Sequence, residues 1–127
     1  MKYGILFEME RGEVRDVLSG TIETEIFYSS RIVKVSQEML KNTRPIRIND
    51  KIARTIAEIV YHGFSYTDCD VNLIRRLFRN YDVYIRENDH DCIAILVIVG
   101  SKHVAKRILR KLEQFEEMNT IPSDYED

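Results

Sequence analysis

The sequence predicts an α+β fold: a mixed, largely antiparallel sheet formed by N-terminal and C-terminal β-hairpins, with about four helices packed on it. Three observations support this class. Strand-like segments rich in Ile, Thr, Phe and Tyr fill residues 3–35, helical patterns follow up to residue 79, and a second hairpin precedes a final amphipathic helix. A run of strands, a run of helices and then strands again is typical of α+β proteins.

The first segment predicts two β-hairpins. Gly12 can supply a positive φ, so Glu10-Arg11-Gly12 is the expected first turn, and Ser19-Gly20 is the expected second turn. Ser29-Ser30 separates the last two strands as polar punctuation. The four expected strands are Tyr3–Met9, Glu13–Leu18, Thr21–Tyr28 and Arg31–Val35.

Three helices are expected next, each from a start signal and an apolar stripe. Ser36 begins the first, and Pro45 sets its latest end. Asn49 is a good N-cap for the second, and Gly63 stands where a C-terminal cap belongs. The stripes are Ile52, Ile56, Ile59 and Val60 in the second helix, and Val71, Ile74, Leu77 and Phe78 in the third.

The last third of the chain predicts a hairpin and a helix. Asp82–Arg86 is a strand, and Cys92–Val99 is apolar without alternation, so both of its faces are expected to be covered, as in a central strand. Gly100-Ser101 ends it. The final helix should bury Val104, Ile108, Leu112 and Phe115, with Ala105 and Leu109 beside them.

Length and composition predict one soluble domain. At 127 residues the chain fits a single domain, which we place at residues 1–118, and residues 119–127 form an acidic tail that we expect to be disordered. The longest apolar run, Cys92–Val99, is far shorter than a membrane span, and no segment resembles a signal peptide. We therefore expect a cytoplasmic protein with no membrane partner. A net charge of −2 means that any anion binding must come from local clustering.

The final helix carries its charges against the helix macrodipole. Basic side chains occupy its first two turns, whereas Glu113, Glu116 and Glu117 lie near its end. A macrodipole favours the opposite arrangement by up to about 1 kcal/mol per charge, and a local rule broken this consistently points to function. With three arginines of the preceding helix, the candidate anion-binding residues are Arg75, Arg76, Arg79, Lys102, His103, Lys106, Arg107, Arg110 and Lys111. The alternative is a solvated charged face, partly neutralised by the glutamates and the tail.

The middle of the chain gives a second indication of nucleic-acid binding. Arg44-Pro-Ile-Arg-Ile48 is a short basic strand, and two helices follow it from Asn49 onward. This order resembles the ribbon-helix-helix repressors, which implies that Arg44 and Arg47 are secondary candidates for DNA contacts. The bridge Phe64–Asp70 is longer than that family usually shows, and the alternative interpretation is two helices packed on a sheet.

Metal binding and catalysis have weaker patterns. His62, Cys69, His90 and Cys92 are the candidate metal ligands, but their spacing lacks the Cys-x2–4-Cys pair of zinc sites, and Cys92 can be a small buried apolar residue. The sequence contains neither a nucleophile elbow nor a pair of carboxylates in an apolar setting, so these signals of an enzyme are missing. The sequence therefore favours a non-catalytic protein without a cofactor or bound metal.

Two functions remain open. The first is a small regulatory protein whose basic helical face binds an anion, with nucleic acid as the leading ligand. The second is a protein–protein adaptor or dimerisation module. Folds of the roadblock and longin kind also end in a hairpin, an apolar strand and a helix, and the present chain is similar to them in that order of elements alone. The second function implies a protein partner or a homodimer, in which the apolar strand or a helix face pairs with another subunit.

Overall fold

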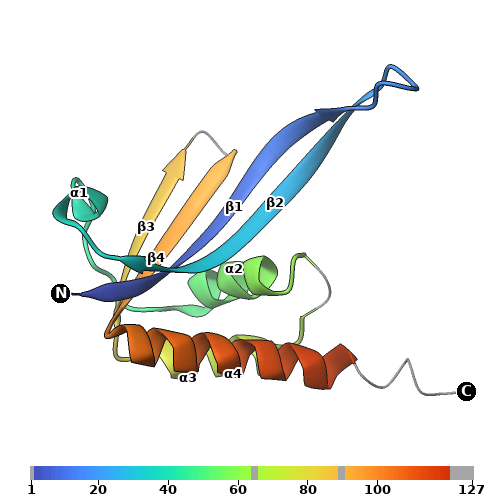
Figure 1. Ribbon diagram of the computed structural model, residues 1–127. Coiled ribbons are helices and arrows are strands. Elements are labelled where there is room, and N and C mark those ends of the chain that lie inside the picture. The colour runs from blue at the N-terminus through green and yellow to red at the C-terminus, as the bar shows by residue number, and fades with distance from the viewer. Residues whose placement is uncertain (1, 64–65, 89–90, 121–127) are drawn as a thin grey trace, which may run out of the picture.

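The computed structural model describes residues 2–63, 66–88 and 91–120, and it confirms the α+β class. Four antiparallel strands form one sheet in the order β2-β1-β4-β3. Helices α2, α3 and α4 cover one face of that sheet (Figure 1). The elements are β1 (Tyr3–Arg15), β2 (Ile22–Lys34), α1 (Gln37–Leu40), α2 (Asp50–Val60), α3 (Asp68–Phe78), β3 (Asp82–Asn88), β4 (Cys92–Gly100) and α4 (Lys102–Thr120).

The N-terminal segment forms one long hairpin instead of the two short hairpins that we predicted. Strand β1 continues through the expected turn at Glu10-Arg11-Gly12, and β2 continues through Ser29-Ser30. Gly12 does not have a positive φ. A Cβ atom there would lie 2.8 Å from Cε2 of Phe27, so glycine leaves room for the ring on the neighbouring strand. Gly12 therefore has a structural role, but that role is to admit the Phe27 ring and not to form a turn.

The single turn of this hairpin lies at residues 16–21, where the Ser19-Gly20 prediction is correct. Gly20 has a φ of +73°, which favours glycine. The carboxylate of Asp16 accepts hydrogen bonds from the backbone N–H groups of Leu18 (3.0 Å) and Ser19 (3.4 Å). Hydrogen bonding from Ser19, then from Leu18, lowers the pKa of Asp16 below its usual value. Local polar contacts therefore close the turn.

Helices α1 and α2 begin where the sequence predicted. Ser36 precedes α1 without a side-chain cap hydrogen bond, whereas the side chain of Asn49 accepts a hydrogen bond from the N–H of Ile52 (2.9 Å) at the start of α2. Gly63, with a φ of +75°, donates its N–H to the carbonyl of Glu58 (2.8 Å) after α2. Helix α4 ends at Thr120, two residues beyond the predicted domain boundary, and residues 121–127 lie outside the described part.

The hydrophobic core lies between the sheet and helices α2, α3 and α4. Phe7 of β1 meets Phe78 of α3 edge to face, with ring centroids 5.8 Å apart. The apolar stripes are buried as predicted, except that Val60, Leu77, Val104 and Leu109 are only partly buried. The predicted contact of Phe115 concerns a side chain outside the described residues.

Strand β4 is central, with β1 on one side and β3 on the other, as the apolar run predicted. Ile95 and Val97 face the helices and are fully buried, whereas Leu96 faces the other side of the sheet and is 5% exposed. Leu96 packs over Gly4, where a Cβ atom would lie 2.9 Å from its Cδ1. Helix α1 covers part of this second face, where a small pocket of about 160 Å³ separates Met39 from the sheet.

The long hairpin projects beyond the rest of the sheet. Residues Tyr3–Glu10 of β1 pair with β4, but Arg11–Arg15 pair only with β2. We call residues 11–27 the arm; it extends away from the helices in Figure 1. Apart from Met39 and Ile46, the exposed large apolar side chains of the described chain lie on it: Val14, Val17, Leu18, Ile22, Ile26 and Phe27.

Candidate functional site

The basic side chains of α4 point away from the protein core. Ala105, Ile108 and Leu112 are buried against the sheet and helices, and the helical period places the basic residues largely opposite this stripe. All six candidates on this helix are exposed: Lys102, His103, Lys106, Arg107, Arg110 and Lys111. Among the described residues, none of them forms an ion pair. Their charges are therefore directed to solvent.

The N-terminus of α4 adds positive potential to this face. The hydroxyl of Ser101 accepts a hydrogen bond from the N–H of Val104 (3.1 Å), and the backbone carbonyl of Ser101 accepts one from the N–H of Ala105 (3.1 Å). The first turn contains no acidic residue. The macrodipole and the basic side chains therefore act in the same direction there, which favours an anionic ligand.

Helix α3 begins with a reciprocal capping box. Thr67 accepts a hydrogen bond from the N–H of Asp70 (3.3 Å), and the backbone N–H of Thr67 donates to the Asp70 carboxylate. These bonds satisfy Asp70, a buried charged side chain. The capping box fixes the start of the helix, and the arginines of its later turns are exposed.

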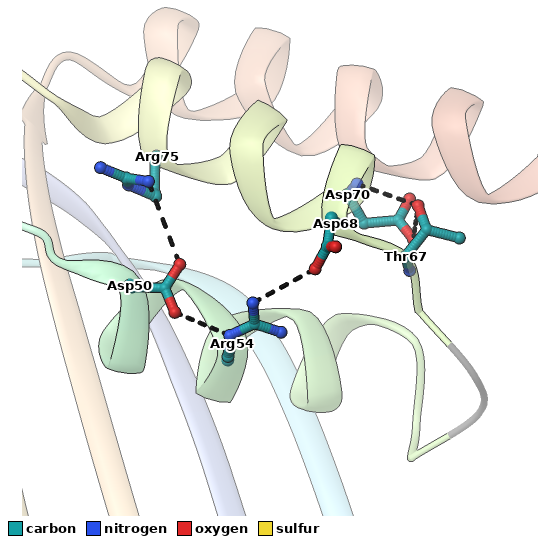
Figure 2. Close-up of polar contacts among 6 residues, drawn as sticks. All are labelled: Asp50, Arg54, Thr67, Asp68, Asp70 and Arg75. Atoms are coloured by element: carbon teal, nitrogen blue, oxygen red, sulfur yellow. Dashed lines mark hydrogen bonds and ion pairs between the residues drawn. The ribbon is translucent and has the colours of Figure 1, made fainter.

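An ion-pair network joins α3 to α2 and reaches one of these arginines (Figure 2). Arg54 of α2 contacts Asp50 (2.7 Å) and Asp68 (3.2 Å), and Arg75 lies 4.0 Å from Asp50. Hydrogen bonds to Asp50, then to Asp68, raise the pKa of Arg54 above its usual value. Because all four side chains are exposed to water, the network contributes little stability, but Asp50 partly neutralises Arg75.

The arginines of α3 line an open groove on the surface of the helical layer. It has a volume of about 560 Å³ and is lined by Ile48, Cys69, Asn72, Arg75, Arg76 and Arg79. In the described part of the chain, Arg76 and Arg79 form no ion pair. The groove therefore offers two uncompensated guanidinium groups beside an amide, a combination that suits phosphate oxygens.

Helices α3 and α4 lie side by side in the helical layer and contact each other (Figure 1). Eight of the nine predicted anion-binding residues lie on these two helices, and Arg79 is the C-cap of α3. The groove beside α3 is lined by none of the six candidates on α4. The secondary candidates Arg44 and Arg47 lie elsewhere. They flank Ile46, which forms a single β-bridge to Val83 of β3, with hydrogen bonds of 2.8 and 3.0 Å. The predicted basic strand is therefore reduced to one bridged residue, Ile46, which pairs within its own chain.

The candidate metal ligands lie on different elements. His62 follows α2 and stacks on Tyr28 of β2, with ring centroids 5.7 Å apart; Cys69 is exposed on α3; Cys92 begins β4. His90 lies outside the described residues. Within the part of the chain that the structure describes, no three His, Cys, Asp or Glu side chains form a cluster suited to a metal.

The surroundings of Cys92 favour its thiol over its thiolate form. Burial raises its pKa, and the neighbouring carboxylates of Glu10, Asp91 and Glu8 raise it further. A raised pKa lowers the thiolate fraction at neutral pH, and the thiolate is the form that attacks electrophiles or binds metal. The surroundings of Cys92 therefore suit a packing role.

Sequence reasoning missed two features of this molecule. The Asp50–Arg54 pair could have been found, because the two residues stand four apart on a predicted helix. The arm could not, because the turn signal at Gly12 divided it into two shorter hairpins.

Comparisons with known proteins gave no match to a family model, a curated protein or a solved structure. No helix of the described chain is both long and apolar enough to cross a membrane.

Proposed function

We propose that the protein is a non-catalytic binding protein whose α3–α4 face binds the phosphate backbone of nucleic acid. The observation that carries this proposal is the exposure of eight Lys and Arg side chains on two adjacent helices, most of them without an acidic partner among the described residues. Uncompensated charge of this kind is costly to keep together unless an anion neutralises it.

The distribution of charge along the molecule supports the same ligand. The net charge of the chain is −2, yet the described side chains of α4 include five Lys or Arg residues and one Glu, whereas the two arginines of α3 are matched by Asp68 and Asp70 at its start. Strands β1 and β2 carry Glu8, Glu10, Glu13, Glu23 and Glu25. The same strands also carry Arg11, Arg15, Arg31 and Lys34, so the hairpin is nearly balanced in charge and a polyanion would approach α4 instead. Such contacts track phosphates and read no base sequence.

The test is the salt dependence of binding. We expect fluorescence anisotropy with random-sequence duplex DNA and single-stranded RNA to show binding at about 50 mM salt that weakens steeply by about 200 mM, because neutralised phosphates release counterions. The double variant Lys106→Glu, Arg107→Glu should weaken binding at least about tenfold on every sequence and reduce the salt slope by about 2.

A matched control separates the face from the net charge. Arg11→Glu with Arg15→Glu changes the charge of the chain by the same amount, but both residues are exposed on the arm. This control should bind like the unmodified protein. Equal weakening by the two double variants, or no binding of either nucleic acid at about 50 mM salt, would contradict the proposal.

A second candidate function, a protein–protein adaptor, is favoured by a different observation. The arm exposes apolar side chains that the described residues of its own chain do not cover, with Phe27 50% and Leu18 99% exposed. Exposed apolar groups gathered on one projection are typical of interaction surfaces. Size-exclusion chromatography of the double variant Leu18→Ser, Ile22→Ser tests the adaptor function. If the variant no longer forms a complex that the unmodified protein forms, the adaptor is supported. If the elution profiles of the two proteins are the same, the result counts against the adaptor.

A further inference from the structure

The outer edge of β2 is open along its whole length. Strand β2 is thirteen residues long, and within the described chain β1 is its only strand neighbour. Its pairing with β1 runs without a bulge from Ile22 to Lys34, and the strand contains no proline. Proteins normally protect an edge with bulges, prolines, lysines or short strands. This edge has no bulge and no proline, and its charged side chains are Glu23, Glu25, Arg31 and Lys34, so its backbone groups stay available to another strand of complementary charge.

The hydrogen-bonding pattern tells which groups are free. The N–H of Arg11 donates to the carbonyl of Asp91 (2.7 Å), on the side of β1 away from β2. Arg11 faces Ile26, so this pair is one that makes no hydrogen bond between β1 and β2. Alternation then directs the backbone N–H and C=O groups of the even-numbered residues of β2 outward, from Ile22 to Ile32.

We propose that this edge pairs antiparallel with β2 of a second copy of the chain, with Phe27 opposite the partner's Phe27 on a two-fold axis. The two four-stranded sheets would then form one continuous sheet. The axis is perpendicular to the sheet, because antiparallel partners in one sheet keep the same faces on the same side. Such an interface is isologous, which closes the assembly at two copies.

The side chains of β2 select this register. Around Phe27, Glu23 lies opposite the partner's Arg31. Arg31 already forms an ion pair with Glu8 within its own chain, so Glu23 adds a second carboxylate beside that guanidinium group, and two-fold symmetry makes this contact twice. Apolar residues face apolar residues: Ile22 meets the partner's Ile32, and Ile26 meets the partner's Tyr28. Centring the pair on Glu25 would instead oppose two glutamates, and centring it on Tyr28 would set Ile26 against a serine.

The same pairing explains the exposed arm. A two-stranded hairpin is only marginally stable in water on its own, yet β1 and β2 continue for several residue pairs beyond β4. A second hairpin beside it would make the arm four-stranded and would cover the outer sides of Ile22, Ile26 and Phe27. The inference goes beyond nucleic-acid binding and does not depend on it.

Disulfide trapping tests the register. In a chain with Cys69→Ser and Cys92→Ala, we expect Phe27→Cys to form a covalent dimer under mild oxidation, because directly opposed residues lie within disulfide distance. Glu25→Cys alone and Ser29→Cys alone should not form a covalent dimer, because position 25 of one copy lies opposite position 29 of the other. Mixing the Glu25→Cys and Ser29→Cys chains should produce a covalent heterodimer.

Sedimentation equilibrium tests the association itself. Glu23→Arg opposes two like charges in each half of the interface and should raise the dimer dissociation constant at least about tenfold. Glu13→Arg makes the same change of charge on β1, away from the edge, and should leave the dimer dissociation constant unchanged. A protein that stays monomeric at millimolar concentration would overturn the proposal, and so would covalent dimers of Glu25→Cys alone.

Discussion

The two halves of the long hairpin have the same local structure and different surroundings. In the body, Ile5 and Phe7 of β1 are fully buried beneath α2, α3 and α4. In the arm, the same two strands continue with unbroken register, but no third strand pairs with them. Other elements reach only its base, where Arg11 and Ile26 line a pocket with Thr55 of α2 and Asp91. Apolar residues occur in both halves, but they are fully buried only in the body, whereas those of the arm remain from 38% (Val14) to 99% (Leu18) exposed.

This difference separates two uses of an apolar residue in a strand. Burial in the body supplies the free energy of folding, because the apolar area leaves water within one chain. The arm gains less from its own apolar residues, which is why we propose that a surface from outside the chain covers them. If so, substitutions in the body should lower stability at any concentration, whereas substitutions in the arm should affect association.

The largest contrast is expected between two phenylalanines. Phe7→Ala removes a fully buried ring that contacts Phe78 and should lower the free energy of unfolding by about 3–5 kcal/mol. Phe27→Ala removes a half-exposed ring and should cost about 1 kcal/mol or less in dilute protein. Urea unfolding at micromolar concentration measures both. Equal losses would show that the arm belongs to the folding core.

Two glycines of β1 give a smaller contrast. A Cβ atom at Gly4 would lie 2.7 Å from the carbonyl oxygen of Val97, which the sheet holds in place, so Gly4→Ala should cost about 1–3 kcal/mol. At Gly12 the close atom belongs to the half-exposed ring of Phe27, which can move. Gly12→Ala should therefore change the free energy of unfolding by less than about 1 kcal/mol. Thermal unfolding of the two variants measures both losses. If the arm were the more rigid part, Gly12→Ala would destabilise the protein more than Gly4→Ala.

Cys92 reports on the point where the body ends, because it pairs with Glu10, the last residue of β1 beside β4. Burial, then the nearby carboxylates, raise its pKa, so less thiolate is present at a given pH in the folded protein. In a Cys69→Ser chain, alkylation of folded Cys92 should reach half its maximal rate at a higher pH than in the urea-unfolded chain. Coincident pH profiles would indicate that this boundary is open to water.

The predictable part of the fold has local signals. Asn49 and Gly63 bound α2 because each satisfies backbone groups at a helix end, and the unbroken apolar run of β4 indicates a strand covered on both faces. The hairpin was predicted wrongly because a glycine in the sequence can indicate either a positive φ or the close approach of a neighbouring ring, and Gly12 has the second role. Only the neighbouring strand distinguishes these two uses.

The candidate site was predictable in its residues and not in its charge balance. Helical periodicity sufficed to place Lys106 and Arg107 on the exposed side of α4. It could not show that Asp50 lies near Arg75, because that contact joins two helices whose packing depends on the whole core. The free edge of β2 has no sequence signature, since it follows from strand order.

Hydrogen exchange at the edge of β2 tests the distinction between body and arm most directly. The backbone N–H groups of Ile22, Thr24 and Ile26 point away from β1, whereas those of Ile95 and Val97 lie inside the sheet. On raising the protein from micromolar to millimolar concentration, exchange at the three arm amides should slow at least about tenfold, while the two β4 amides stay protected throughout. Arm amides that exchange rapidly at every concentration would contradict the account.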